Sequence, residues 1–356
     1  MKNNKFINKT LTTVIASVMT ATTTIMAQEK ENPWGLVYDN AIVENVAGAV
    51  QLRPVTYDVD GITVAANVYL PAGYDATKSY AAVVVSHPNG GVKEQVSGMF
   101  AQALAEAGYI AIACDARYQG MSGGKPRGLD NPTFRIGDIR GMIDYISQYP
   151  GVDKNRIGAF GVCGGGGYTI AAAKGDKRIK AVATLSMFNT GRVRRNGYCD
   201  SQLETIQERL RQASEARQQE AETGITVYPQ KPKQKAADDK QKAPTFDLYN
   251  EGAFYYGKSK YAHANDGASA PLSCMLDLMT WDATDHIDLI NQPLLMMVGE
   301  KADSRYMTDE AMEKATGTAD KSLFVVPGAT HIKTYYVPEY VAQERERLVK
   351  FFNEKL

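Results

Sequence analysis

The chain has 356 residues and 40 basic and 40 acidic side chains, so its formal net charge is zero at pH 7. Without a basic excess it lacks the electrostatic footprint of a nucleic-acid-binding protein, and we exclude that class. At roughly 150 residues per domain, the length fits either two domains or one large α/β domain with an insertion.

The N-terminus has the pattern of a secretory signal peptide over residues 1–27. Lys2, Lys5 and Lys9 precede an uncharged stretch at 11–26, the order found in signal peptides. The stretch is rich in Thr and too short for a convincing membrane span. We therefore expect an exported protein, periplasmic in a Gram-negative source, with no membrane span after signal removal.

Residues 28–188 alternate between apolar strand patterns and helical patterns. Two β-branched segments around Asp60-Gly61 predict a β-hairpin. Further strands are predicted at 81–86, 109–114, 156–162 and 181–187, and helices at 93–108 and 134–149. This alternation is typical of an α/β fold with a mostly parallel central sheet and helices on both faces. Residues 28–188 are therefore the predicted first part of the core.

The alternation of strands and helices then stops over a long segment. We interpret this segment, residues 189–290, as a cap or lid insertion. It holds a predicted polar helix at 202–223 and a linker-like run at 231–242. It also holds an aromatic group: Phe246, Tyr249, Phe254, Tyr255, Tyr256 and Tyr261. These rings either pack the cap or line a substrate pocket. The second part of the core, 291–356, has predicted strands and a final helix.

A Gly-rich turn begins at the end of the predicted strand 156–162. Its sequence, Gly161-Val162-Cys163-Gly164-Gly165, has the G-x-nucleophile-x-G form of a nucleophile elbow, with Cys in the usual place of Ser. Gly161 and Gly165 lack a Cβ where strand and helix pass closest. Gly164 is placed to turn its N–H toward an oxyanion. A flexible loop or a phosphate cradle is the alternative, but no G-K-[ST] follows. Cys163 is the predicted nucleophile.

A thiol nucleophile needs a base to remove its proton. Only four histidines are available. His331 follows the last predicted core strand, where an elbow-type hydrolase places its base. His87 ends an earlier strand and suits a structural role under its loop, while His263 and His286 fall in the insertion. His331 is therefore the predicted base.

The base needs an acceptor that holds its tautomer and stabilises the imidazolium. Asp303 lies in the short loop after the predicted strand that precedes the last core strand, and it is the first candidate for this acid. Glu300 is the second candidate. The chain order Cys163, Asp303, His331 is that of an α/β-hydrolase triad. A surface carboxylate is the alternative role for either acid.

The loop His87-Pro88-Asn89-Gly90 is expected to supply a second oxyanion donor. Because Pro88 has no N–H, the donor is the backbone of Asn89 or of Gly90. A simple Pro-Asn-Gly turn is the alternative. No H-E-x-x-H or C-x-x-C pattern exists, so we expect neither a metal nor a cofactor.

Three cysteines lie outside the elbow. Cys114 ends an apolar strand and is expected to be a small buried residue. Cys199 and Cys274 both fall in the insertion and are a candidate disulfide pair in an oxidising compartment.

The motifs resemble the dienelactone hydrolase-like branch of the α/β-hydrolases. The resemblance covers most of the chain after about residue 50 and rests on residues 86–95, 115–124, 161–166 and 327–331. It implies a Cys-His-Asp triad acting on esters or lactones, carried over here to Cys163, His331 and Asp303. The long insertion and the predicted export distinguish this chain from the compact cytosolic members of that branch.

The leading hypothesis is a cofactor-independent hydrolase of small-molecule carboxylic esters, lactones or thioesters. A covalent acyl-enzyme would form on Cys163, with Gly164 and Asn89 holding the oxyanion. A peptidase of the same fold and a catalytically inactive binding protein are the alternatives. The oligomeric state stays open.

Overall fold

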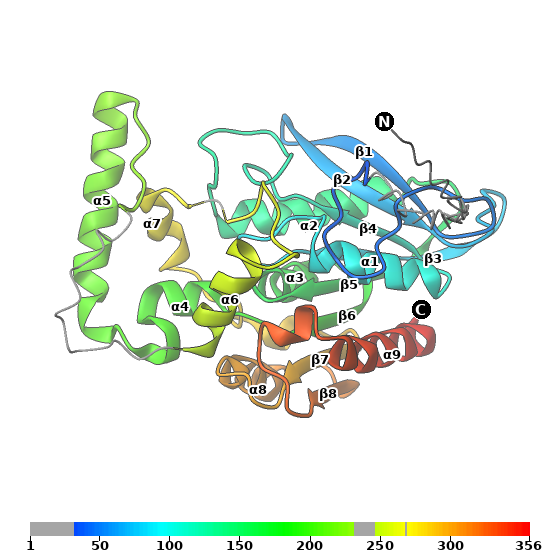
Figure 1. The fold of residues 1–356 in the computed structure, drawn as a ribbon. Coiled ribbons are helices and arrows are strands. Elements are labelled where there is room, and N and C mark those ends of the chain that lie inside the picture. The colour runs from blue at the N-terminus through cyan, green and yellow to red at the C-terminus, as the bar shows by residue number, and fades with distance from the viewer. Residues whose placement is uncertain (1–31, 231–245, 268) are drawn as a thin grey trace, which may run out of the picture. The chain divides into compact units, whose positions relative to one another are not determined.

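The computed structural model describes residues 32–230, 246–267 and 269–356 (Figure 1). The predicted signal peptide and the predicted linker-like run at 231–242 lie outside these residues. The described residues belong to one compact unit. Among them, no helix combines the length and the apolar character that a membrane span requires.

The core is an eight-stranded sheet with the order β1-β2-β4-β3-β5-β6-β7-β8. Its strands are β1 Gln51–Val59, β2 Ile62–Leu70, β3 Tyr80–Ser86, β4 Ile110–Cys114, β5 Val152–Val162, β6 Ile179–Leu185, β7 Leu294–Gly299 and β8 Lys321–Val326. β2 pairs antiparallel with both β1 and β4, and every other neighbouring pair is parallel. The predicted hairpin and the predicted mostly parallel α/β sheet are confirmed.

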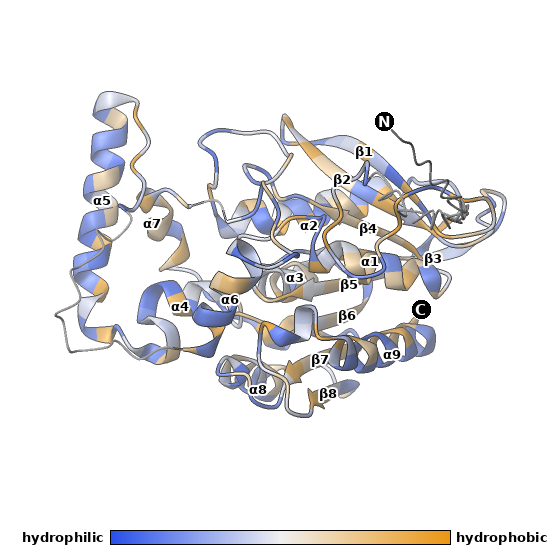
Figure 2. Cartoon of the chain, in the orientation of Figure 1, coloured by the Kyte–Doolittle hydropathy of each residue, from blue (hydrophilic) through white to orange (hydrophobic). Residues whose placement is uncertain are grey.

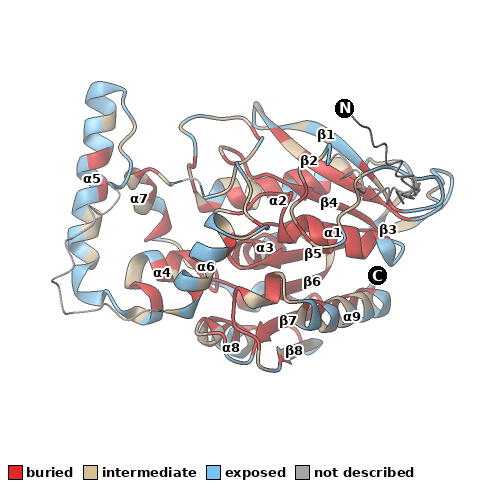
Figure 3. Cartoon of the chain, in the orientation of Figure 1, coloured by how far each residue is buried: buried red, intermediate tan, exposed pale blue. Residues whose placement is uncertain are grey.

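Helices connect the parallel strands. They are α1 Val96–Glu106, α2 Pro132–Ile146, α3 Gly164–Gly175 and α8 Arg305–Lys314, and the C-terminal helix α9 Pro338–Lys355 follows the last strand. α1 leads from β3 to β4, whereas α3 leads from β5 to β6, in the opposite direction across the sheet. Because parallel crossovers are right-handed, α1 and α3 cover opposite faces. The central strands are accordingly buried on both sides (Figure 3).

The direction of the crossovers reverses between β3 and β5. In an open α/β sheet such a reversal leaves a crevice outside the carboxyl ends of the two strands, where ligands bind. Ser86 at the end of β3 pairs with Gly161 near the end of β5. The loop after β3 and the Gly-rich turn after β5 therefore start side by side.

Among its described residues, the predicted cap consists of helices, short 3-10 turns and loops, without a strand. Its longer elements are α4 Thr190–Asn196, α5 Ile206–Thr223, α6 Asp247–Gly257 and α7 Met275–Leu278, with short 3-10 turns at Tyr198–Asp200, Leu203–Thr205, Leu272–Cys274 and Ile287–Leu289. α5 buries only Ala213 and Ala216 and is otherwise mostly polar and exposed (Figures 2 and 3). The boundaries of the cap as a separate domain stay a prediction.

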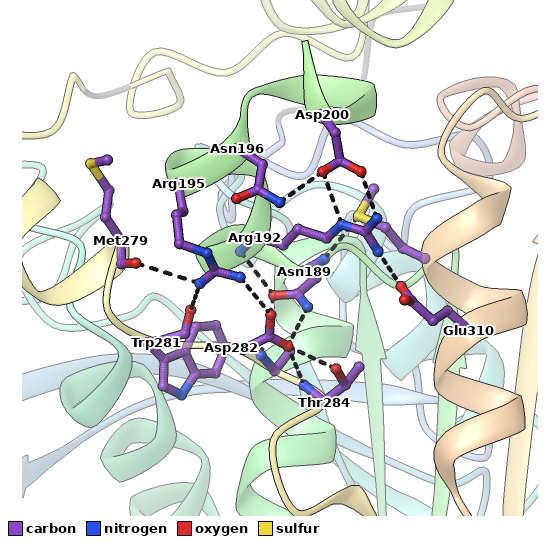
Figure 4. Close-up of polar contacts among 12 residues, drawn as sticks. Asn189, Arg192, Arg195, Asn196, Asp200, Met279, Trp281, Asp282, Thr284 and Glu310 are labelled. Atoms are coloured by element: carbon purple, nitrogen blue, oxygen red, sulfur yellow. Dashed lines mark hydrogen bonds and ion pairs between the residues drawn. The ribbon is translucent and has the colours of Figure 1, made fainter. Parts of the chain in front are cut away.

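A polar network fixes α4 to the rest of the chain (Figure 4). The guanidinium of Arg192 donates to Asp200 and forms an ion pair with Glu310 of α8. Arg195 forms an ion pair with Asp282, which also accepts from the Asn189 amide at 2.6 Å. The ion pair with Glu310 therefore joins α4 to the core, and the other contacts join parts of the predicted cap to one another.

Candidate active site

The Gly-rich turn between β5 and α3 has the backbone of an elbow. Cys163 lies at φ 55° and ψ −122°, a conformation that non-glycine residues adopt at a cost of about 1–3 kcal/mol. The Cys163 N–H donates to the carbonyl of Leu185, and its own carbonyl accepts from Phe188, both at 2.9 Å. Strand β6 and the segment that follows it therefore hold the strained residue in place.

Two glycines make the close approach of strand and helix possible. A Cβ on Gly161 would lie 2.4 Å from the carbonyl oxygen of Gly165. A Cβ on Gly165 would lie 2.5 Å from the carbonyl oxygens of Ser86 and His87. No side chain fits at these distances, so the expected roles of both glycines are confirmed.

Cys163 borders a pocket of about 380 Å³ and is 8% exposed. Its sulfur lies close to the backbone N–H groups of Gly164 and Asn89 and to the hydroxyl of Tyr335. Burial raises the pKa of the Cys163 thiol, and these three donors and the Arg135 charge oppose the rise. The structure thus brings the predicted nucleophile and both predicted oxyanion donors together.

His331 lies beyond the end of β8 and is fully buried. Its Nε2 is 2.9 Å from the hydroxyl of Tyr335, and its Nδ1 is 2.5 Å from the hydroxyl of Ser304. Burial lowers the pKa of His331 to about 3. The predicted base is therefore a neutral imidazole in a site that offers it no charged partner.

Asp303 does not reach His331, contrary to the prediction. Its carboxylate accepts from the Tyr198 hydroxyl at 2.6 Å and from the Leu248 N–H at 3.2 Å. The backbone of the loop turns the next side chain, Ser304, toward the imidazole instead. Asp303 therefore connects two parts of the cap to the core.

Glu300, the second candidate for the acid, also lies elsewhere. It is exposed, and its carboxylate accepts from the N–H of Gly328 at 2.8 Å. His87, the other histidine of the predicted loops, is bonded on both ring nitrogens, to the Pro88 carbonyl at 2.7 Å and to the Ala116 N–H at 3.0 Å. His87 has the structural role that the sequence suggested.

Sequence reasoning missed Ser304 and Tyr335. Tyr335 stands four residues after His331, in a short 3-10 turn, Lys333–Tyr335, that has no periodic pattern. Ser304 is adjacent to the predicted acid, and its hydroxyl is a weaker signal than a carboxylate. The only available clue was their proximity in sequence to His331 and Asp303.

The aromatic group of the cap serves both of its proposed purposes. Tyr249 and Tyr256 line the pocket beside Cys163. Tyr255 is buried and packs on Tyr335 and on Tyr261, with ring centroids 5.5 and 5.7 Å apart. The cap therefore shapes the pocket and also supports the residue that contacts the thiol.

Arg194 of α4 carries the one charge among the described residues that line this pocket. Its neighbours Arg192 and Arg195 are engaged by carboxylates (Figure 4). The exposed guanidinium of Arg194 forms no hydrogen bond or ion pair with any residue in the described ranges. It is therefore available to a bound molecule.

The predicted Cys199–Cys274 disulfide is wrong for this structure, in which both cysteines are free. They lie in separate 3-10 turns, where Cys199 is exposed beside the Asp303 carbonyl and Cys274 is buried. Cys114 is a buried, free cysteine, as expected.

Comparisons with known proteins agree with this architecture. A family model described as X-Pro dipeptidyl-peptidase (S15 family) matches residues 60–272. The uncharacterized protein YcjY of Escherichia coli is 38% identical over 299 residues, which cover 83% of this chain and 95% of that protein.

Two solved structures are also similar. The crystal structure of PA2218 from Pseudomonas aeruginosa has a TM-score of 0.79 and 32% identity, covering 92% of this chain and 98% of that one. The α/β hydrolase GrgF from Penicillium has a TM-score of 0.71, covering 86% and 99%, and at 19% identity it shows the fold alone. The predicted α/β-hydrolase fold is therefore confirmed.

The sequence match extends through the elbow, and the structural match includes the sheet that positions it. The chain belongs to the X-Pro dipeptidyl-peptidase (S15) family of the α/β-hydrolase superfamily, and it is a hydrolase.

Proposed function

We propose that the protein hydrolyses carboxylic esters, lactones or thioesters through a covalent acyl-enzyme on Cys163. One observation carries the proposal: the strained elbow places the Cys163 sulfur against the N–H groups of Gly164 and Asn89 at the wall of a pocket. A nucleophile with two fixed backbone donors is what acyl transfer requires.

The reaction starts when the substrate carbonyl binds above Cys163. The sulfur attacks the carbonyl carbon while its proton passes to His331, and the N–H groups of Gly164 and Asn89 hold the oxyanion. The tetrahedral intermediate expels the alcohol or thiol, which takes the proton back from His331. Water then attacks the thioester with His331 as base, and the free acid leaves.

The electrostatics of the base favour an ester or thioester over an amide. The acceptor at the Nδ1 of His331 is the neutral Ser304, and burial holds the pKa of His331 at about 3. Such an imidazole is a weak base, so it suits an electrophilic carbonyl with a good leaving group. An amide needs more assistance, because its amine leaves only when it is protonated.

The charge of the pocket supports the same choice. An enzyme that releases dipeptides from a free N-terminus must hold an ammonium group, which a carboxylate does best. The described residues that line the pocket include no carboxylate, and their one charged side chain is Arg194. We therefore propose acyl groups that carry an anionic substituent as the preferred substrates. A peptidase of the same fold is the second candidate, since the family model is named for one.

A substrate panel tests the proposed reaction. Wild-type enzyme and Cys163→Ala are assayed with p-nitrophenyl esters, a lactone, an acyl thioester and a Gly-Pro anilide. We expect turnover of the esters or thioester by the wild type and loss of at least about a thousandfold in Cys163→Ala. Turnover of the anilide alone would establish the peptidase, and no turnover of any substrate would favour an inactive binding protein.

Arg194→Gln tests the substrate class. The mono-p-nitrophenyl ester of glutaric acid is compared with p-nitrophenyl pentanoate, which has the same chain length without the carboxylate. We expect Arg194→Gln to raise KM about tenfold for the glutarate alone, because one charge-assisted contact is lost. Arg217→Gln, on the exposed side of α5, is the matched control. Equal effects on both esters would contradict an anion-binding role.

A further inference from the structure

The hydroxyl of Tyr335 lies between the thiol of Cys163 and the imidazole of His331. It is 2.9 Å from Nε2 of His331, and it lies near the Cys163 thiol on the wall of the same pocket. Both ring nitrogens of His331 are thereby occupied, Nε2 by Tyr335 and Nδ1 by Ser304. The base that the proposed function needs contacts the nucleophile through a phenol.

The direction of these hydrogen bonds follows from the donors that each group has. A neutral imidazole with its proton on Nδ1 donates to Ser304 and accepts at Nε2. Tyr335 then donates its proton to Nε2, and its oxygen is left to accept from the S–H of Cys163. The three side chains form one continuous donor–acceptor chain that points from the thiol to the base.

The surroundings of Tyr335 hold its ring in this position. The side chain is 2% exposed and packs edge-to-face on Tyr255 at a centroid distance of 5.5 Å. The titratable groups that face its hydroxyl are Cys163, His331, Tyr255 and Tyr256. All four groups are neutral in the resting site. The hydroxyl of Tyr335 therefore forms hydrogen bonds there but no ion pair.

We propose that Tyr335 is a catalytic residue that relays the proton from Cys163 to His331 as the thiol attacks the substrate. This inference rests on the proposed function and deepens it. As the sulfur–carbon bond forms, the S–H proton moves to the oxygen of Tyr335, and the original phenolic proton moves to Nε2 of His331. Tyr335 is a neutral phenol before and after, and His331 becomes the imidazolium that later protonates the leaving group.

The relay resolves a difficulty in the resting site. Burial raises the pKa of Cys163 and lowers that of His331, so a preformed thiolate–imidazolium pair is disfavoured there. A concerted transfer avoids that pair, because charge separates only when the oxyanion forms between the N–H groups of Gly164 and Asn89. Burial also raises the pKa of Tyr335, which keeps the phenol protonated at the start.

Tyr335→Phe removes the relay and keeps the ring. We expect the rate of acylation, measured as the burst of p-nitrophenol, to fall about a hundredfold, in the range of general acid–base effects. Tyr336→Phe, at the next residue, is the control: Tyr336 lines a separate pocket that does not include Cys163, and the variant should acylate at the wild-type rate. Equal melting temperatures of the three proteins establish that the fold is retained.

A second measurement uses only wild-type enzyme, so it does not depend on the folding of a variant. The acylation rate in mixtures of light and heavy water should depend quadratically on the deuterium fraction, since two protons move together. A linear dependence, or a Tyr335→Phe variant that acylates as fast as or faster than wild type, would overturn the relay. If wild type itself forms no acyl-enzyme, the proposed function fails instead, and the two failures are distinguishable.

Discussion

Ser304 and Asp303 are neighbours on one loop, but they perform different tasks. The Ser304 hydroxyl lies 2.5 Å from Nδ1 of His331, whereas the Asp303 carboxylate accepts from Tyr198 and Leu248 of the cap. A hydroxyl can hold the tautomer of His331, but it stabilises the imidazolium less than a carboxylate does. This difference agrees with the low pKa, about 3, of His331.

The separation of these tasks predicts different kinetics for two variants. Ser304→Ala should lower kcat about tenfold, because the imidazole loses the partner that orients it. Asp303→Asn should leave kcat within about threefold and raise KM, because it weakens only the cap contacts. Steady-state kinetics with an ester substrate checks both. The opposite result, a large loss of kcat in Asp303→Asn with Ser304→Ala unaffected, would restore the Cys-His-Asp triad.

Glu344 of α9 predicts a pH dependence of stability. It is 0% exposed, neither carboxylate oxygen has a partner among the described residues, and burial raises its pKa well above 4.5. The folded state therefore holds a proton that the unfolded state loses above that value. Stability falls as the pH rises, by about 1.4 kcal/mol per pH unit between the unfolded and folded pKa values.

Glu344→Gln mimics the protonated carboxyl at every pH. Its free energy of unfolding should match that of wild type near pH 4 and exceed it at pH 8. Denaturant titrations at the two pH values measure the difference. Glu346→Gln, on the exposed side of the same helix, is the control. Equal stability of Glu344→Gln and wild type at pH 8 would exclude a buried, protonated Glu344.

At the scale of elements, the site depends on how closely β5, α3 and the loop after β3 approach one another. A Cβ at Gly165 would overlap the carbonyl oxygens of Ser86 and His87 at 2.5 Å, and backbone atoms cannot move aside cheaply. Gly165→Ala should therefore lower both the melting temperature and the activity, at a cost of about 1–3 kcal/mol.

The matched control lies on the same helix. Gly175→Ala, at the C-terminal end of α3, meets only the far end of the Arg140 side chain at 3.5 Å. It should keep the wild-type melting temperature and ester turnover. A Gly165→Ala variant as stable and as active as Gly175→Ala would contradict the tight elbow.

The sequence could predict the elements, because each one has a local signal. Continuous apolar runs identified the buried strands, and the elbow motif located Cys163 on its strained turn. Chain order alone located His331. Local patterns could not decide which of two adjacent side chains, Asp303 or Ser304, turns toward the imidazole, since that depends on how the loop packs. Tyr335 reaches the thiol only through tertiary folding.

At the scale of the whole molecule, the loop after β7 contacts both the predicted cap and the predicted base. The carboxylate of Asp303 binds Tyr198 near the start of the predicted cap and Leu248 of α6, which also lines the pocket. Ser304, the next residue, contacts His331. Docking of the cap and orientation of the base are therefore linked by adjacent residues. The signal peptide and the exported location stay predictions, which N-terminal sequencing of the secreted protein would check.

The central claim is that Cys163 becomes acylated. Enzyme quenched during turnover of a slow ester or thioester is digested, and its peptides are weighed by mass spectrometry. We predict that the peptide containing Cys163 gains the mass of the acyl group in wild type and that Cys163→Ala gains none. Product release without any adduct on that peptide, or full turnover by Cys163→Ala, would contradict the account.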